Sequence, residues 1–405
     1  VKLNIDRLLD PANHLSRRTY FTPIEKVEVA DPLTVRITLK HPLGTFLSRL
    51  ANGTVQMVCP SLLKSDKDVA FNACGTGPYV LKDYHPRDRL HVVQNQNYRV
   101  AGLPKLDGIL WRPVVENSTR AAMVRTGEAQ FAHPMPAEQI KVLQKEPNID
   151  ILVQPSVIVR YLFINNLHKP FTDVRVRRAI NYAINKEALA KVAFSGYARP
   201  VTGVVPEVFE FATKPGPWPY DPKKARELLK EAGYPQGFET VLWSGYNNTT
   251  GQKVIQFIQQ QLRQVGIRTT LRSLEAGQRV ALVESVQDPM KAGMRLYYIG
   301  WSNSTGEIDL AMRPLFHSES WAPALANEGF YKNEKVDRLL DEAIAETDRT
   351  KRAKLYEEVQ STIWNDAPWA FLVTEDVTGA SAKTLKNFRL RPDSSYDFYE
   401  AELVK

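Results

Sequence analysis

The sequence predicts an α/β protein whose domains are interleaved along the chain. Three observations lead to this fold class: the length, the composition, and alternating strand and helix patterns with no linker between them. The chain has 405 residues, which corresponds to two or three domains at about 150 residues each. Hydrophobic residues make up 43% and charged residues 24%, and these values exclude disordered and coiled-coil proteins.

The first part of the chain mixes short strands with short helices. Residues 1–9 have a helical pattern of apolar residues. Apolar and polar residues alternate from Ile24 to Leu39 around Asp31-Pro32, and this alternation predicts a β-hairpin. We expect a helix with Pro60 near its start. Further strands are expected at 79–81, 90–93 and 108–115, and a helix at 118–124.

The middle part begins with a long extended run at 151–165 and continues as helix. Asp173 opens a segment in which apolar residues recur at helical spacing from Val176 to Ala183, as in an amphipathic helix. Alternating strand and helix patterns follow. We expect strand 240–243, helix 252–265 and strand 267–271 to form a β-α-β unit, which places its two strands parallel in one sheet.

One helix of the middle part has well-defined ends in the sequence. Asp221 is a suitable N-cap, Pro222 fits the first helical position, and Gly233 fits the residue after the last turn. Beyond it we expect a strand at 294–298 that leads into Gly300-Trp301. Two helices, at 336–344 and 355–363, and short strands after residue 368 complete the pattern.

The sequence contains no recognisable catalytic motif. Neither a G-x-S-x-G elbow, nor an H-E-x-x-H zinc helix, nor a phosphate-binding Walker loop occurs. Carboxylate pairs such as Glu307 and Asp309 are expected by chance in a chain of this charge. We therefore expect a binding protein without a cofactor and not an enzyme such as a hydrolase, and unchanged ligand mass after release would separate the two.

The charge balance favours a small acidic ligand. Lys and Arg exceed Asp and Glu by eight, but the excess is spread along the chain and forms no basic stripe of the kind that nucleic acids require. The longest strongly apolar stretches, 157–164 and 369–373, are shorter than the roughly 20 residues of a membrane span. The chain starts at Val1 with no signal-peptide pattern, so we expect it to be trimmed.

The two cysteines, Cys59 and Cys74, allow two interpretations. They are either two buried thiols or a disulfide formed in an oxidising compartment, and we favour the disulfide. A zinc site would need four ligands at defined spacing, and the cysteines and scattered histidines do not supply them.

Two places in the sequence are candidates for ligand binding. Trp301, Ser302, Asn303 and Ser304 follow a strand, and ligands of open α/β sheets gather at the carboxyl ends of strands. The alternative is a solvated loop that Trp301 anchors. Arg160 is the second candidate, because a guanidinium within an apolar strand needs a carboxylate partner or an outlet to water. A structural ion pair is the alternative there.

Several motifs resemble a known family, the solute-binding proteins of peptide, opine and nickel ABC importers. The resemblance rests on Cys74–Tyr79, Val174–Leu189 and Asp221–Pro235. Further segments resemble the members of this family that bind glutathione. These segments are Gly203–Pro206, Gly216–Pro222, Glu275–Val280, Glu284–Pro289 and Ala367–Glu375.

The resemblance implies a two-lobed, hinged fold of the periplasmic-binding-protein type (class II, peptide-binding), with lobe two inserted into lobe one. Residues 1–157 and 374–405 would form lobe one, which lacks the family's N-terminal segment here, and residues 158–373 would form lobe two. The ligand would lie between the lobes and favour their closure. The resemblance further implies a monomeric, exported, periplasmic protein that delivers its ligand to the membrane subunits of an ABC importer, and it favours the disulfide.

The resemblance also suggests a ligand and its contacts. Peptide-binding relatives hold the ligand's amino group with an Asp where Ser304 stands, so glutathione or a related small peptide, with an amino-acid head at its γ-linked end, is expected. Asp309 would hold the ammonium, and Arg160, Arg279 or Arg313 the carboxylates. Tyr161 and residues 301–304 would complete the site. A general di- or oligopeptide receptor is the alternative. Some relatives bind haem or a nickel chelate, but this sequence shows no exposed His pair that would favour either ligand.

Overall fold

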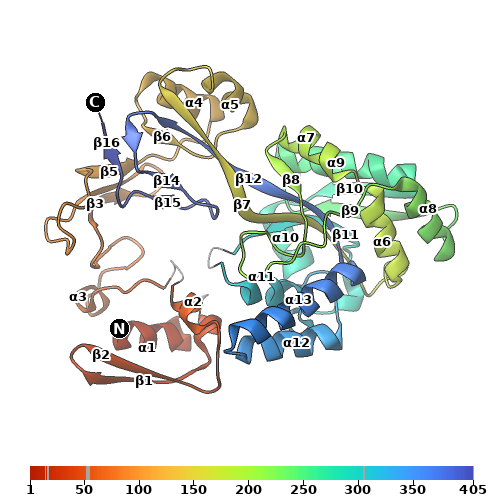
Figure 1. The fold of residues 1–405 in the computed structure, drawn as a ribbon, viewed down its shortest axis with the longest axis horizontal. Helices are drawn as coiled ribbons and strands as arrows, with labels where there is room; N and C mark the ends of the chain where they lie inside the picture. The colour runs from red at the N-terminus through yellow and green to blue at the C-terminus, as the bar shows by residue number, and fades with distance from the viewer. Residues whose placement is uncertain (14, 16–17, 52–54, 304–305, 405) are drawn as a thin grey trace. The chain divides into compact units, whose positions relative to one another are not determined.

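The computed structural model describes residues 1–405 except 14, 16–17, 52–54, 304–305 and 405. The chain folds into two compact units. Unit 1 comprises Val1–His41, Leu50–Gln154 and Val377–Lys405, and unit 2 comprises Pro42–Arg49 and Pro155–Asp376. Strands β7 (Ile149–Ile164) and β12 (Trp369–Ala382) run from one unit into the other (Figure 1).

Unit 1 contains small antiparallel sheets and short helices. The predicted hairpin is confirmed as β1 (Ile24–Asp31) paired with β2 (Thr34–Leu39). A second sheet has the order β3-β4-β5. Its strands are β3 (Tyr79–His85), β4 (Arg89–Gln94) and β5 (Gly108–Trp111). The other elements of this part are α1 (Lys2–Leu9), α3 (Pro60–Leu63), α4 (Asn117–Thr126), β6 (Phe131–Ala132), α5 (Ala137–Leu143), β13 (Leu385–Lys386), β14 (Arg389–Leu390), β15 (Tyr396–Asp397) and β16 (Glu402–Leu403).

Cys59 and Cys74 form a disulfide in unit 1, so the favoured interpretation of the two cysteines is confirmed. The bond joins the residue before α3 to the loop that leads into β3. The same two residues are also joined through the backbone, because the N–H of Cys59 donates to the carbonyl of Cys74 at 3.1 Å.

Unit 2 is built on most of a seven-stranded sheet with the order β10-β9-β11-β7-β12-β6, in which β8 also pairs with β12. The predicted β-α-β unit is confirmed, because β9 and β10 are parallel from Phe238↔Ile267 to Ser244↔Ser273. The strands and short helices of this part are α2 (Phe46–Leu50), β8 (Ala198–Pro200), β9 (Phe238–Ser244), β10 (Ile267–Ser273), α10 (Ala276–Arg279), the π-helical turn η3 (Val280–Glu284) and β11 (Leu296–Trp301).

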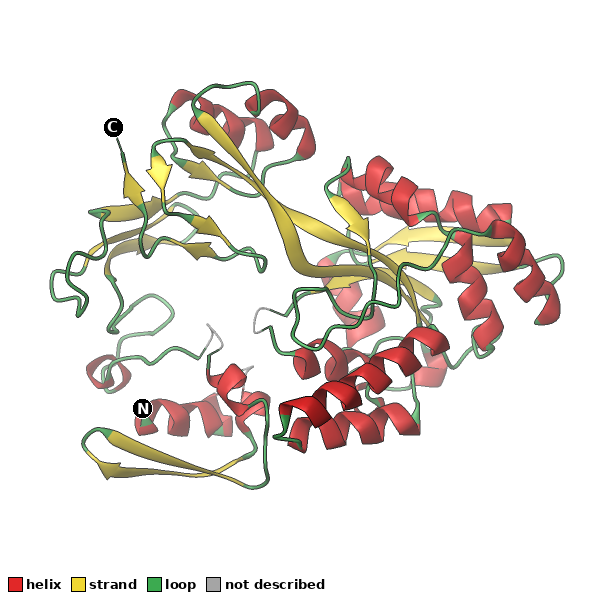
Figure 2. Ribbon diagram, in the orientation of Figure 1, coloured by secondary structure: helices red, strands yellow, loops and turns green. Residues whose placement is uncertain are grey.

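Helices cover both faces of this sheet (Figure 2). Residues of α6 (Val174–Ala183), α7 (Lys186–Phe194), α8 (Pro222–Glu231) and α9 (Thr249–Gln264) pack in one apolar cluster. Residues of α11 (Ile308–Phe316), α12 (Glu334–Ala345) and α13 (Arg349–Asp366) pack in the other. As predicted, α8 begins at its cap, where the carboxylate of Asp221 accepts the N–H of Lys224 at 2.9 Å.

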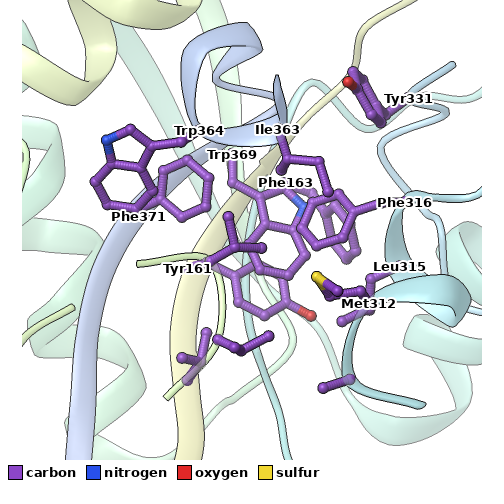
Figure 3. Close-up of a cluster of buried hydrophobic side chains, with 14 of the residues drawn as sticks. Tyr161, Phe163, Met312, Leu315, Phe316, Tyr331, Ile363, Trp364, Trp369 and Phe371 are labelled. Carbon is purple, nitrogen blue, oxygen red and sulfur yellow. The ribbon is translucent and has the colours of Figure 1, made fainter. Parts of the chain in front are cut away.

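Strand β7 supplies side chains to both clusters, because successive residues of a strand point to opposite faces. Tyr161 and Phe163 belong to the α11–α13 side, whereas Leu162 and Ile164 belong to the α6–α9 side. A strand that is apolar on both faces is typical of the centre of a covered sheet. In Figure 3, Tyr161 stacks on Trp369 with ring centroids 3.6 Å apart.

Strand β11 begins two residues later and ends three residues later than the sequence pattern predicts. We expected residues 294–298, but the strand runs from Leu296 to Trp301. The reason for the later end is its partner: Gly300 pairs with Arg160 and Trp301 with Val159 of β7, so the antiparallel ladder continues past the apolar run. Trp301 therefore ends a strand and does not belong to a free loop.

Candidate functional site

The sheet of unit 2 collects several of the predicted binding residues at one edge. Strands β9, β10 and β11 are parallel, so their carboxyl ends meet, and the residues that follow them lie at this "carboxyl edge". Strand β7 runs antiparallel to β11 and brings Arg160 opposite Gly300, at the same edge. Open α/β sheets bind ligands at such an edge, which makes it the candidate site.

A small pocket opens beside the end of β11. Its walls are apolar side chains of β7, of residues 204–209 and of α11, together with Trp369, and its polar members are Trp301 and Asn303. Trp301 Nε1 is buried without a hydrogen-bond partner among the described residues. The side-chain amide of Asn303 donates to the carbonyl of Glu307 at 2.7 Å, which fixes the start of α11. The pocket is thus mostly apolar, and Trp301 and Asn303 carry polar groups among its lining residues.

Arg160 is held by a carboxylate and a phenol. Its Nε and Nη2 donate to Glu375 Oε2 at 2.8 and 2.5 Å, and its Nη1 donates to the hydroxyl of Tyr246 at 2.5 Å. The guanidinium also lies 4.9 Å from the centre of the Tyr246 ring. Burial opposes its charge, but the carboxylate of Glu375 outweighs burial and raises the pKa of Arg160. Of the two interpretations of Arg160, the structure shows the ion pair.

Gly300 leaves room for this guanidinium. A Cβ at Gly300 would lie 2.5 Å from Nη1 and 2.9 Å from Cδ of Arg160, and 3.0 Å from the carbonyl oxygen of Val159. Sequence reasoning noticed Gly300 only as the neighbour of Trp301. Its role is to let a long charged side chain cross the adjacent strand.

Replacing Gly300 by alanine is expected to lower the free energy of unfolding by about 1 to 3 kcal/mol, because the new methyl group overpacks Arg160 against the strand. Urea denaturation measures this change. Gly277→Ala is the matched control, since no atom lies within 4 Å of a Cβ there, and a helical position in α10 favours alanine by up to about 1 kcal/mol. Equal stability of the two variants would contradict the packing role of Gly300.

Asp309 and Arg313 bind each other. Arg313 Nε donates to both carboxylate oxygens of Asp309, at 3.1 and 3.0 Å, while its Nη2 donates to the carbonyl of Leu340 at 2.6 Å. Asp309 is fully buried, and Arg49 Nη2 lies 3.8 Å from its carboxylate. These contacts tie α11 to α12 and to the segment that contains α2.

The remaining predicted residues differ in their accessibility. Arg279 forms an ion pair with Glu284 at 2.7 Å, and both side chains are about one third exposed. Ser302 is exposed, whereas Tyr161 is buried in the apolar cluster. Ser304 lies outside the described residues. The structure therefore places Trp301, Ser302 and Asn303 together and gives Arg160 and Arg313 protein carboxylates as partners.

Two residues of the carboxyl edge escaped the sequence reasoning. Glu375 is the partner of Arg160, and its signal was an acid at the end of the apolar run 369–373. Tyr246 follows β9 and had no signal beyond its place after a strand. A guanidinium in one apolar strand and a carboxylate at the end of another are complementary, and this complementarity could have paired Arg160 with Glu375.

No group of three or more His, Cys, Asp and Glu side chains in the described part of the chain is arranged to hold a metal ion. None of the described helices combines the length and the apolar character that crossing a bilayer requires.

The sequence and the fold match known proteins. Residues 1–323 match the family model described as bacterial extracellular solute-binding proteins, family 5 middle. The chain is 49% identical over 404 residues to the glutathione-binding protein GsiB of Escherichia coli (strain K12), covering all of this chain and 79% of that protein. The GsiB of Pectobacterium atrosepticum is 49% identical over 406 residues, with the same coverage.

Two solved structures have the same fold. The periplasmic binding protein DppA of Helicobacter pylori, associated with an ABC transporter and in complex with peptide STSA, has a TM-score of 0.79 and 26% identity, over 99% of this chain and 80% of that chain. The peptide-binding protein AppA of Clostridium difficile, described as putative, has a TM-score of 0.89 and 21% identity, over 99% and 84%.

Proposed function

Because the chain belongs to the bacterial extracellular solute-binding proteins of family 5, we propose that it captures glutathione and delivers it to an ABC importer. The family binds solutes and does not convert them, so the chain is not an enzyme. The chain also has the family's two-lobed fold. The observation that carries the proposal is 49% identity over the whole chain to relatives named for glutathione binding.

The place of action that fits this function is the periplasm. The matching family is extracellular, and the H. pylori relative is named as periplasmic and associated with an ABC transporter. The Cys59–Cys74 disulfide agrees with an oxidising compartment. We propose that the protein is exported by means of a signal peptide and acts there as a monomer.

The contacts of the ligand are proposed at the carboxyl edge of unit 2. Trp301 offers an unpartnered indole N–H beside the pocket, and Ser302 and Asn303 follow it. Arg279 is the proposed receptor for a ligand carboxylate, since its side chain and that of its partner Glu284 are both about one third exposed. Arg160 and Arg313 already bind protein carboxylates, so we assign them to positioning and not to direct contact.

The chemistry of glutathione suits this set of residues. Its γ-linkage leaves an amino-acid head with ammonium and carboxylate at one end, and a second carboxylate at the glycine end. Two carboxylates and one ammonium give the ligand a net charge of about −1 at neutral pH. The protein carries a formal charge of +8, which favours the approach of an anion.

A second candidate function is general peptide binding, favoured by the structural match to DppA in complex with peptide STSA. The two candidates differ in one chemical feature, the γ-linkage. A tripeptide of the same composition with an α-linked glutamate has its ammonium next to the first peptide bond, and its free carboxylate lies on the side chain.

Calorimetric titration of the purified protein tests the proposal. We expect heat of binding with reduced glutathione and none with α-linked Glu-Cys-Gly or with Ala-Ala-Ala at the same concentration. Binding of all three peptides would replace glutathione by peptides in general as the ligand. No heat with any of them would contradict both candidate functions for this chain.

A further inference from the structure

Glu328 is a buried acid with one carboxyl oxygen that has no hydrogen-bond partner among the described residues. Three acidic residues are buried in the part of the chain that the structure describes, Glu307, Asp309 and Glu328. Glu307 accepts the N–H groups of Asp309 and Leu310, both at 3.0 Å, and Asp309 pairs with Arg313. Glu328 Oε2 has no hydrogen-bond partner among the described residues. A carboxylate left so is costly in a protein interior.

The surroundings of Glu328 contain a second unsatisfied group. The hydroxyl of Tyr297 is also buried without a partner among the described residues. Glu328 acts electrostatically on the phenols of Tyr297 and of Tyr161, and these three groups are called the polar region below. Buried polar groups with free hydrogen-bonding capacity are typical of a site that awaits a polar partner.

Arg279 and Glu284 link Glu328 electrostatically to partly exposed side chains of unit 2. Both residues act electrostatically on Glu328, and their ion pair, at 2.7 Å, is about one third exposed. The hydroxyl of Tyr297 reaches the carboxyl edge, because a Cβ on Gly245, just after β9, would lie 2.5 Å from it. A buried acid and a partly exposed guanidinium therefore interact electrostatically.

We propose that the polar region and Arg279 together bind the amino-acid head of the ligand, with Glu328 receiving the ammonium and Arg279 receiving the α-carboxylate. In the free protein Glu284 is the partner of Arg279, and the ligand's α-carboxylate replaces it on binding. The hydroxyl of Tyr297 accepts a further N–H of the ammonium. The inference rests on the proposed function, and it names the groups that recognise the γ-linked end of glutathione.

The binding step includes the release of one proton. In the free protein, burial and the nearby Glu284 raise the pKa of Glu328 to about 8, while Arg279 opposes the rise, so the carboxyl group is mostly protonated at pH 7. A ligand ammonium stabilises the carboxylate and lowers this pKa. The Glu328 carboxylic acid then becomes a carboxylate paired with the ammonium, and its proton passes to the buffer.

The sign of the resulting pH dependence follows from linkage. The bound state holds fewer protons than the free state below pH 8, so the affinity for glutathione rises as the pH increases from 6 to 8. The charged or titratable groups that interact electrostatically with Glu328 are Tyr161 of β7, Tyr297 of β11, Arg279 of α10 and Glu284 of η3.

A double-mutant cycle between protein and ligand tests the proposal. The variants are Glu328→Gln and, as a surface control, Glu227→Gln, whose side chain is 61% exposed. The ligands are reduced glutathione and its analogue without the α-amino group. We expect Glu328→Gln to weaken glutathione binding about 10- to 100-fold and to leave the analogue's affinity unchanged, whereas Glu227→Gln changes neither.

Titration in phosphate and in Tris at pH 7, two buffers of different ionisation enthalpy, gives the number of protons released. We expect release with the wild type and glutathione, and none with Glu328→Gln or with the analogue. If Glu328→Gln binds glutathione as the wild type does, or weakens both ligands equally, the ammonium role is wrong while the proposed function stands. A wild type that binds no glutathione would contradict the proposed function as well.

Discussion

Replacing Asp309 by alanine is expected to lower the free energy of unfolding by about 3 to 5 kcal/mol, because it removes the buried carboxylate of a largely buried guanidinium and leaves it only an exposed one. Arg313 is only 21% exposed and holds Asp309, which is fully buried, at 3.0 Å. The same guanidinium binds the carbonyl of Leu340, so the loss also loosens α12. Urea denaturation, followed by circular dichroism, measures the difference from the wild type.

The matched control is Asp341→Ala, which removes another carboxylate from the same arginine. Asp341 lies 2.7 Å from Arg313, but its side chain is 62% exposed, and an exposed ion pair contributes only about 0 to 1 kcal/mol. Two variants of similar stability would show that burial does not decide the effect. At a temperature where Asp309→Ala is still folded, we expect it to bind glutathione, because the pair supports the site without touching the ligand.

The sequence predicted the parts of the fold that depend on neighbouring residues. The ends of the helix between Asp221 and Gly233 were predicted to within one or two residues. Its N-cap, its first-turn proline and its final glycine each act on residues only a few positions away in the sequence. The hairpin of β1 and β2 was predicted for the same reason. The length of β11 depends on β7, more than 130 residues away, and its end was predicted too early.

The sequence predicted that several candidate residues lie at the carboxyl end of β11, whereas their roles in ligand binding remain predictions. The carboxyl end of β11 was expected from the rule for open sheets, and the pocket beside Trp301 lies there. Arg160 needed a partner, yet Glu375 follows 215 positions later, so only the fold joins them. Asp309 and Arg313 are spaced i,i+4 on a helix, a spacing that favours an ion pair, and this signal was available but was interpreted as ligand binding.

The ligand itself could not be inferred from charge or periodicity. A net charge of +8 favours any small anion, and the apolar pocket suits many peptides. The resemblance of whole segments narrowed the choice to glutathione, while the lobe boundaries at 157/158 and 373/374 and the direct contacts remain predictions. Local physical rules thus place the elements, and the identity of the ligand depends on tertiary contacts that are distributed along the chain.

Two tryptophans line the same pocket, and we expect their removal to have opposite consequences. Trp369 is 1% exposed and stacks on Tyr161, and its ring centroid lies 4.4 Å from that of Phe316 (Figure 3). Trp369→Ala is expected to lower the free energy of unfolding by about 3 to 5 kcal/mol, because it leaves a cavity in the larger apolar cluster.

Trp301 lies at the rim of that pocket and is only partly buried, with an indole N–H that no described residue accepts. Trp301→Ala is therefore expected to change the free energy of unfolding by less than about 2 kcal/mol. The same change is expected to weaken glutathione binding about tenfold or more, because the ligand loses one hydrogen bond and the contact with the indole ring. Trp301→Phe keeps the ring and removes the N–H, so it separates the two contributions. Denaturation and calorimetry on the three variants check both effects. If Trp301→Ala loses stability as Trp369→Ala does and keeps its affinity, Trp301 belongs to the core and the ligand binds elsewhere on the carboxyl edge.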